Sequence, residues 1–145
     1  MNLDIILWKT ITDVKVENND CIIFTCDDGS CFEASHMQDC CEEVKIYDIN
    51  EDLSCLIGEE IIGVKEEESK IWPNDVGKEN FCIDSFTWTT HTFQTSKNTV
   101  IVRWIGLSNG FYSEKIHFTR THKQIPMQTY AEFSFPEGFP VTGLY

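Results

Sequence analysis

The stretch HMQDCCEEV, residues 36–44, gathers an imidazole, two adjacent thiols and several carboxylates within nine positions. Thiolate and imidazole groups suit zinc, and a structural zinc site needs four ligands in a tetrahedron. The spacing Cys31-x4-His36-x4-Cys41 matches the second half of a zinc knuckle. The usual Cys-x2-Cys turn is missing, although a hairpin would still place cross-strand cysteines side by side. One hypothesis is therefore a zinc site, set against ordinary buried or loop thiols; its ligands would be Cys26, Cys31, His36 and Cys40 or Cys41.

The same stretch holds groups that can serve two kinds of catalysis. A nucleophilic thiol at Cys40 would need His36 to favour the thiolate, because the neighbouring carboxylates of Asp39 and Glu42 suppress it. The sequence shows no strained nucleophile turn or oxyanion loop beside it. Two carboxylates from the set Asp39, Glu42, Glu43 and residues 66–68 could serve hydrolysis or bind a divalent cation. A chain with 24 acidic residues contains such pairs by chance, so both catalytic interpretations are weaker than a binding role.

A second candidate site lies in RWIGLSNGFYSE, residues 103–114. Asn109-Gly110 is a strong signal for a two-residue hairpin turn, and glycine there lets a ligand approach the backbone. The turn would present a dense set of hydrogen-bonding groups, which belong to Ser108, Asn109, Tyr112, Ser113 and Glu114. Considered alone, the segment is better explained as an ordinary hairpin with exposed polar side chains than as a ligand site.

The elements that must position these groups are predicted to be strands. β-branched and aromatic residues dominate segments that are separated by turn residues, at 11–16, 21–26, 44–49, 60–67, 82–95, 99–108 and 111–120. In 99–108 both alternating residue sets are largely apolar, as in a central strand. Segment 50–58 can form one helical turn, capped by Asn50 and ended by Gly58. We expect a mostly β protein, a single-domain antiparallel sandwich or roll over residues 1–120 with one or two short helical turns.

Turn chemistry predicts how these strands connect. Short turn-rich segments at 17–20, 27–30, 96–98 and 109–110 predict direct hairpins. Segment 69–80 is the longest evident loop. Residues 121–145 differ from the rest because three prolines interrupt a series of aromatic side chains. We expect this tail to dock on the body or on a neighbouring subunit, which allows a homo-oligomer.

The charge and the cysteine content limit the compartment and the partners. The net charge is −13, and residues 39–68 hold eleven acids against Lys45 and Lys65. Such a field repels phosphate backbones and steers basic partners, so we expect no direct nucleic-acid binding. No apolar run approaches the roughly 18 residues of a membrane span, and an early acid argues against a signal peptide. We therefore expect no membrane association, a cytoplasmic location and mostly reduced thiols among the seven cysteines.

Two stretches, 36–58 and 85–114, resemble an uncharacterised family of small phage, prophage and bacterial proteins. The shared pattern is His-x-Gln-Asp-Cys-Cys-Glu, then Asp-Leu-x-x-Leu-Ile-Gly, then Ser-Phe-Thr-Trp-Thr, then Arg-Trp-x-Gly-x-Ser-Asn-Gly-x-Tyr-Ser-Glu. The resemblance implies a viral or mobile-element context and no particular activity. Cys21, Cys26 and Cys31 stand outside the pattern, which weakens the zinc hypothesis.

The polar positions of this pattern indicate a binding site, since apolar periodicity and one turn would satisfy the fold. We predict that residues 36–42 and 108–114 lie together and form one recognition surface; its binding residues are His36, Gln38, Asp39, Cys40, Cys41, Glu42, Arg103, Ser108, Asn109, Tyr112 and Glu114. The expected function is that of a small acidic phage or prophage accessory protein without a cofactor. It would inhibit a host protein that has a basic surface, or sequester a small nucleotide signal. The alternatives are a thiol- or metal-dependent hydrolase that uses His36 and Cys40, and a virion or assembly component.

Overall fold

The structure of this chain, a computed structural model, describes residues 2–78, 81 and 84–122. Two short 3-10 helices are η1 (Asn2–Ile6) and η2 (Leu53–Leu56). The strands are β1 (Ile11–Glu17), β2 (Cys21–Cys26), β3 (Cys31–Ser35), β4 (Glu43–Ile49), β5 (Gly63–Ser69), β6 (Ser85–Gln94), β7 (Thr99–Ser108) and β8 (His117–Thr121). The tail predicted over 121–145 lies outside the described residues from position 123 onward.

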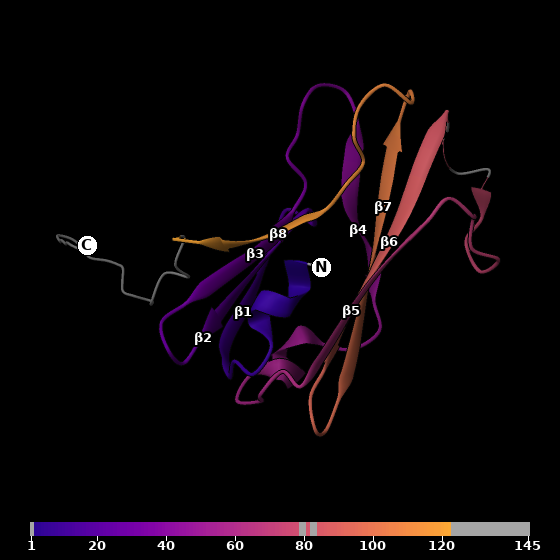
Figure 1. The fold of residues 1–145 in the computed structure, drawn as a ribbon. Coiled ribbons are helices and arrows are strands. Elements are labelled where there is room, and N and C mark those ends of the chain that lie inside the picture. The colour runs from indigo at the N-terminus through magenta and orange to yellow at the C-terminus, as the bar shows by residue number, and fades with distance from the viewer. Residues whose placement is uncertain (1, 79–80, 82–83, 123–145) are drawn as a thin grey trace, which may run out of the picture.

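Within the described residues the strands form two four-stranded antiparallel sheets that pack face to face (Figure 1). One sheet has the order β1-β2-β3-β8 and the other the order β4-β7-β6-β5. Side chains from both sheets make the core between them, including Phe24 and Phe118 from the first and Phe93 and Trp104 from the second. The predicted class, a mostly β antiparallel sandwich with one or two helical turns, is confirmed.

The alternation along β7 explains its central position. Val100, Val102 and Trp104 are fully buried and point into the sandwich. Ile105, from the opposite set, packs on the outer face of the sheet in a second cluster with Trp88. Because both faces bury apolar side chains, β7 lies between β4 and β6, as its sequence predicts.

Three of the four predicted hairpins are present, and the fourth is wrong. β1 pairs with β2, β2 with β3, and β6 with β7. After β7 the chain instead crosses to the other sheet, where β8 pairs with β3. Asn109-Gly110 still makes a turn, since the Asn109 Oδ1 accepts from the Phe111 N–H at 2.9 Å and Gly110 has φ +90°. The apolar alternation of a strand begins only at Ile116, so residues 111–115 form a connection between the sheets.

The short helices close the sandwich. η1 buries Leu3 and Ile6 and contacts β5 and β8, the edge strands of the two sheets. η2 begins after Asp52, whose carboxylate accepts from the Ser54 N–H, so the predicted cap at Asn50 is wrong. Asn50 instead joins β4 to β7, because its Oδ1 accepts from the Ile101 N–H at 2.7 Å.

The acidic segment 39–68 does not form one patch. It includes β4 and β5, which are the two opposite edges of the same sheet. Charged edge strands discourage pairing between the sheets of different molecules. None of the helices in the described part of the chain is long and apolar enough to cross a membrane.

Candidate functional site

The loop between β3 and β4 is organised around the carboxylate of Glu42. This side chain is buried, and the whole residue is 4% exposed. Its Oε2 lies 2.7 Å from Nε2 of His36 and accepts from the Asp39 N–H at 2.8 Å. Its Oε1 accepts from the Cys40 N–H at 2.9 Å. The bond from His36, with help from the backbone donors, lowers the pKa of Glu42 to about 2 despite the burial.

His36 joins this loop to the connection that follows β7. Its Nδ1 lies 2.6 Å from the carbonyl oxygen of Lys115, and its Nε2 faces Glu42. A carbonyl oxygen only accepts hydrogen bonds, so Nδ1 of the imidazole is the donor to Lys115. The predicted adjacency of the two motifs is therefore present, and Figure 1 shows both segments at the same end of the sandwich. We call residues 36–42 and 109–115 together the motif end.

Gln38 and the two cysteines complete the loop. Nε2 of Gln38 donates to the carbonyl oxygens of Cys40, at 3.2 Å, and of Glu42, at 2.6 Å. Cys40 and Cys41 are exposed and joined to each other by a disulfide. We expected mostly reduced thiols; this pair is oxidised, whereas Cys26, Cys31 and Cys55 form no disulfide. A thiol locked in a disulfide is not a nucleophile, so the arrangement does not favour Cys40 as a catalytic residue.

Glu114 organises the connection after β7 in the way that Glu42 organises the loop between β3 and β4. Its side chain is buried, and its Oε1 accepts from the Thr87 hydroxyl at 2.7 Å, while Ser108 donates to Oε2. Burial raises the pKa of this carboxyl, but the hydrogen bonds from Ser108, Thr87 and Ser85 outweigh it and hold the pKa below its ordinary value. Glu114 is therefore a fixed negative charge that fastens the connection to β6 and β7.

The sequence reasoning missed Gly106, on which this arrangement depends. A Cβ built on Gly106 would lie 2.7 Å from Cβ of Glu114 and 3.0 Å from its carbonyl oxygen. Only glycine lets the connection pass this close to β7. The glycine within the Arg-Trp-x-Gly pattern was the available signal.

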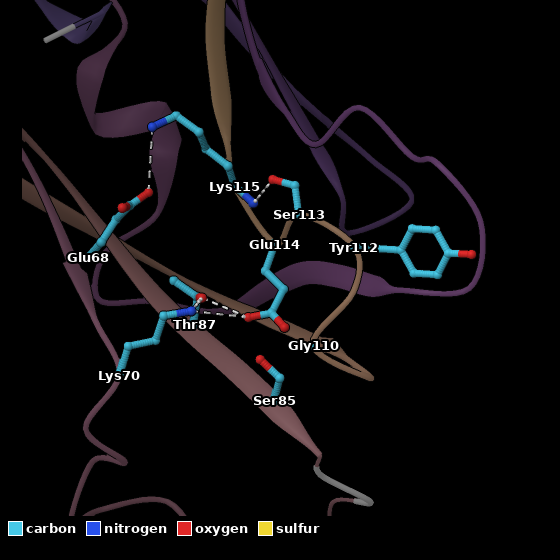
Figure 2. A pocket seen from close by; sticks show the side chains of 9 residues that line it. All are labelled: Glu68, Lys70, Ser85, Thr87, Gly110, Tyr112, Ser113, Glu114 and Lys115. Atoms are coloured by element: carbon cyan, nitrogen blue, oxygen red, sulfur yellow. Dashed lines mark hydrogen bonds and ion pairs between the residues drawn. The ribbon is translucent and has the colours of Figure 1, made fainter.

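A cavity of about 280 Å³ opens beside Glu114 (Figure 2). Nζ of Lys70 lies 3.7 Å from Glu114 Oε1 and donates to Thr87 at 2.5 Å, and Nζ of Lys115 lies 3.9 Å from Glu68. Figure 2 shows these side chains turned toward one another, with the ring of Tyr112 pointing away. The cavity thus has balanced charges that already pair with each other.

A second cavity, of about 190 Å³, lies where the two motifs meet. The pairing of Glu43 with Leu107 brings β4 beside β7 at this point. Its lining residues are Cys41, Glu43, Asp84, Leu107, Ser108, Asn109 and Tyr112. We call it the junction cavity. Both of its charged side chains are acidic. Neither Glu43 nor Asp84 was among the predicted binding residues, although Glu43 was one of the candidate paired carboxylates.

Arg103 does not belong to the motif end. Its guanidinium donates to Asp48 at 2.8 and 2.6 Å and to Asp75 at 3.1 and 2.9 Å. It also lies 5.3 Å from the ring centroid of Tyr47 and 5.7 Å from that of Trp88. Since Asp75 lies in the connection between β5 and β6, the arginine holds this part of the connection against the sheet.

The zinc hypothesis is not supported by the positions of its ligands. Cys31 pairs with Thr25, and the Cys31 thiol lies 3.8 Å from the Thr25 hydroxyl, so these two side chains share one face of the sheet. Cys26 follows Thr25 in β2, so its side chain points to the opposite face. Among the described residues, no three His, Cys, Asp or Glu side chains are placed to hold one metal ion.

Two large apolar side chains of the motif end are exposed to solvent. Met37 is 71% exposed and Phe111 is 82% exposed. Phe111 packs edge-on against Tyr112, with ring centroids 5.2 Å apart. Asp39 and Asn109 are also exposed. The buried polar residues His36, Glu42 and Glu114 therefore hold the loops in place, and the apolar side chains of Met37 and Phe111 are exposed to solvent.

The sequence model of one family, described as a domain of unknown function (DUF7448), matches residues 4–118. This span contains both motif segments, 36–42 and 103–114. No curated protein and no solved structure matches the chain. Membership of an uncharacterised family agrees with the expectation drawn from the motifs, while the phage context stays a prediction.

Proposed function

Because the chain belongs to the DUF7448 family, whose function is unknown, we propose a function from its geometry: a non-enzymatic protein that binds another protein through the motif end. One observation carries this proposal. The side chains of His36, Glu42 and Glu114 are buried and hydrogen-bonded inside the molecule. Phe111 and Met37, in the same two segments, are largely exposed. Exposed aromatic and methionine side chains on a firmly held surface are typical of the centres of protein interfaces.

The hydrogen bonds of the motif end support binding over hydrolysis. A general acid or base needs a position from which it can exchange a proton with a substrate. Both nitrogens of His36 are engaged, by Lys115 and by Glu42. Cys40 is joined to Cys41, and the carboxylate of Glu42 is surrounded by its own loop. The hydrolase alternative would require this network to open before any chemistry.

The finer form of the proposal is an accessory protein of a phage or prophage that inhibits a host protein. The motif resemblance supplies the phage context, and the exposed aromatic surface supplies the means of binding. Sequestering a nucleotide signal is less well supported, because a phosphate in the junction cavity would meet the carboxylates of Glu43 and Asp84. The assembly alternative depends on the tail beyond residue 122 and stays a prediction.

The test compares two substitutions of exposed apolar residues in capture experiments. Phe111→Ser removes the aromatic group from the motif end. Ile71→Ser makes a similar change at a residue that is 79% exposed and follows β5. The immobilised wild-type protein and both variants are incubated with bacterial lysates, and bound proteins are quantified by mass spectrometry.

We expect a protein that the wild-type chain and Ile71→Ser retain and that Phe111→Ser retains at least about tenfold less, as for a central interface residue. Equal retention by all three proteins would overturn the proposal. Equal loss in both variants, or no retained protein, would overturn it as well.

A further inference from the structure

The junction cavity has the chemistry of a site for a positively charged group. Glu43 stands at the start of β4, and Asp84 directly precedes β6, so two separate strands bring carboxylates to one opening. Tyr112 and Asn109 come from the connection that follows β7. A carboxylate pair beside an aromatic ring can bind a cation through hydrogen bonds, charge and the ring face together.

The carboxylate of Glu43 is available to a partner. Its side chain is 61% exposed, and the charge that it meets is Lys45, at 3.2 Å, whose side chain is 41% exposed. Exposed pairs of this kind contribute little and exchange easily with other partners. No basic side chain lines the cavity itself among the described residues.

Elsewhere the protein binds an arginine with the same residue types. On the outer face of the sheet, the guanidinium of Arg103 is bound by the carboxylates of Asp48 and Asp75 and lies over the ring of Tyr47. The lining of the junction cavity also includes two carboxylates and a tyrosine, and its described residues include no arginine. Arginine suits such a site better than lysine does, because its planar fork can donate to two carboxylates at once.

Building on the proposed function, we propose that the junction cavity receives an arginine side chain of the partner protein. The arginine would enter between Glu43 and Asp84, beside Tyr112, while the neighbouring part of the partner covers Phe111. The net charge of −13 would draw such a basic segment toward the chain. The partner is thus a protein with an arginine-containing basic surface next to an apolar patch.

The test uses a defined peptide and NMR of the full chain labelled with 15N. The probe is acetyl-Gly-Arg-Gly-amide, and its control is the same peptide with citrulline, which keeps the shape of arginine without its charge. The variant is Glu43→Gln combined with Asp84→Asn. Its control, Glu51→Gln combined with Glu60→Gln, makes the same change of charge at exposed residues beside η2.

We expect the arginine peptide to shift the amide signals of Cys41, Asn109 and Tyr112 in a saturable manner, and the citrulline peptide to leave them in place. The Glu43→Gln/Asp84→Asn variant should bind the arginine peptide at least about fivefold more weakly, with the control variant within about twofold of wild type. Unchanged dispersion of the remaining signals verifies that each variant is folded. Equal shifts with citrulline, equal binding by both variants, or shifts spread over all acidic surfaces would overturn the inference.

Capture from lysate separates this inference from the proposed function. A partner that depends on Phe111 but binds the Glu43→Gln/Asp84→Asn variant as tightly as wild type would overturn the arginine site and leave the protein-binding function intact. A partner that is insensitive to Phe111→Ser would overturn the proposed function itself.

Discussion

Glu42 and Glu114 are both buried glutamates at the motif end, but they are held in different ways. Glu42 takes its hydrogen bonds from residues at most six positions before it in the same loop, namely His36, Asp39 and Cys40. Glu114 takes its hydrogen bonds from Ser108 and Thr87, and it faces Lys70, which lies 44 positions earlier in the chain. The first carboxylate shapes a loop, and the second fastens a crossing between two sheets. A buried charge can therefore stabilise one loop or connect distant segments, and the sequence separation of its hydrogen-bond partners distinguishes the two cases.

Removal of Glu114 should have the largest effect on stability. Glu114→Ala leaves the buried Thr87 hydroxyl and the Ser108 hydroxyl without their acceptor, so we expect the free energy of unfolding to fall by about 2–3 kcal/mol. Urea denaturation at pH 7 measures this change. Glu68→Ala is the matched control, because Glu68 lines the same cavity with an exposed side chain and should change stability by less than about 0.5 kcal/mol. Similar values for the two variants would mean that Glu114 does not fasten the crossing.

Gly106→Ala should have the next largest effect. The added methyl group would meet the backbone of Glu114, which must move away from β7, and overpacking of this kind destabilises by about 1–2 kcal/mol. Gly63→Ala serves as the control, since the nearest atom to its added methyl group is the end of the flexible Gln94 side chain, at 3.1 Å. Denaturation curves of the two variants give the comparison. A loss for Gly63→Ala as large as that for Gly106→Ala would contradict the close approach of Glu114.

Lowering the pH should gradually reduce the contribution of Glu42 to the free energy of unfolding. Its pKa is lower in the folded chain, about 2, than the ordinary 4.5, so its contribution is complete above about pH 4.5 and is lost as the pH falls toward 2. Other carboxyls with lowered pKa values, including Asp75 and Glu114, act in the same direction. The measurement is therefore the difference in unfolding free energy between wild type and Glu42→Gln from pH 7 to pH 2. We expect the advantage of the wild type to shrink across this window, and a constant difference would contradict the ionised hydrogen-bonded state.

Much of the fold was predictable because it depends on local patterns. The double apolar alternation of 99–108 indicates a central strand, and Asp27, Asp28 and Gly29 indicate the turn between β2 and β3. The crossing after β7 was not predictable from Asn109-Gly110, because the same dipeptide turns the chain whether the next strand pairs in the same sheet or in the other one. That choice depends on the burial of Glu114 and Ile116, which only the packed sandwich determines.

The candidate site was predictable in part. The adjacency of the two motifs was predicted because their polar residues agree with the family pattern. The structure places His36 against Lys115. The roles of those residues were not predictable from the sequence, because the same residue types can form hydrogen bonds within a loop or with a ligand. Arg103 shows the same difficulty, since its partners Asp48 and Asp75 lie 55 and 28 positions away in the chain.

The pairing of β8 with β3 also has a consequence for how the chain folds. Ser35 and His117 are paired although 82 positions separate them, so the entropy of closing this long loop must be overcome before the pairing can stabilise the sheet. His36 meets the carbonyl of Lys115 only when β8 has joined β3. We therefore expect the surface that we propose for binding to form late in folding, and a partner that recognises it would distinguish fully folded molecules from incompletely folded ones.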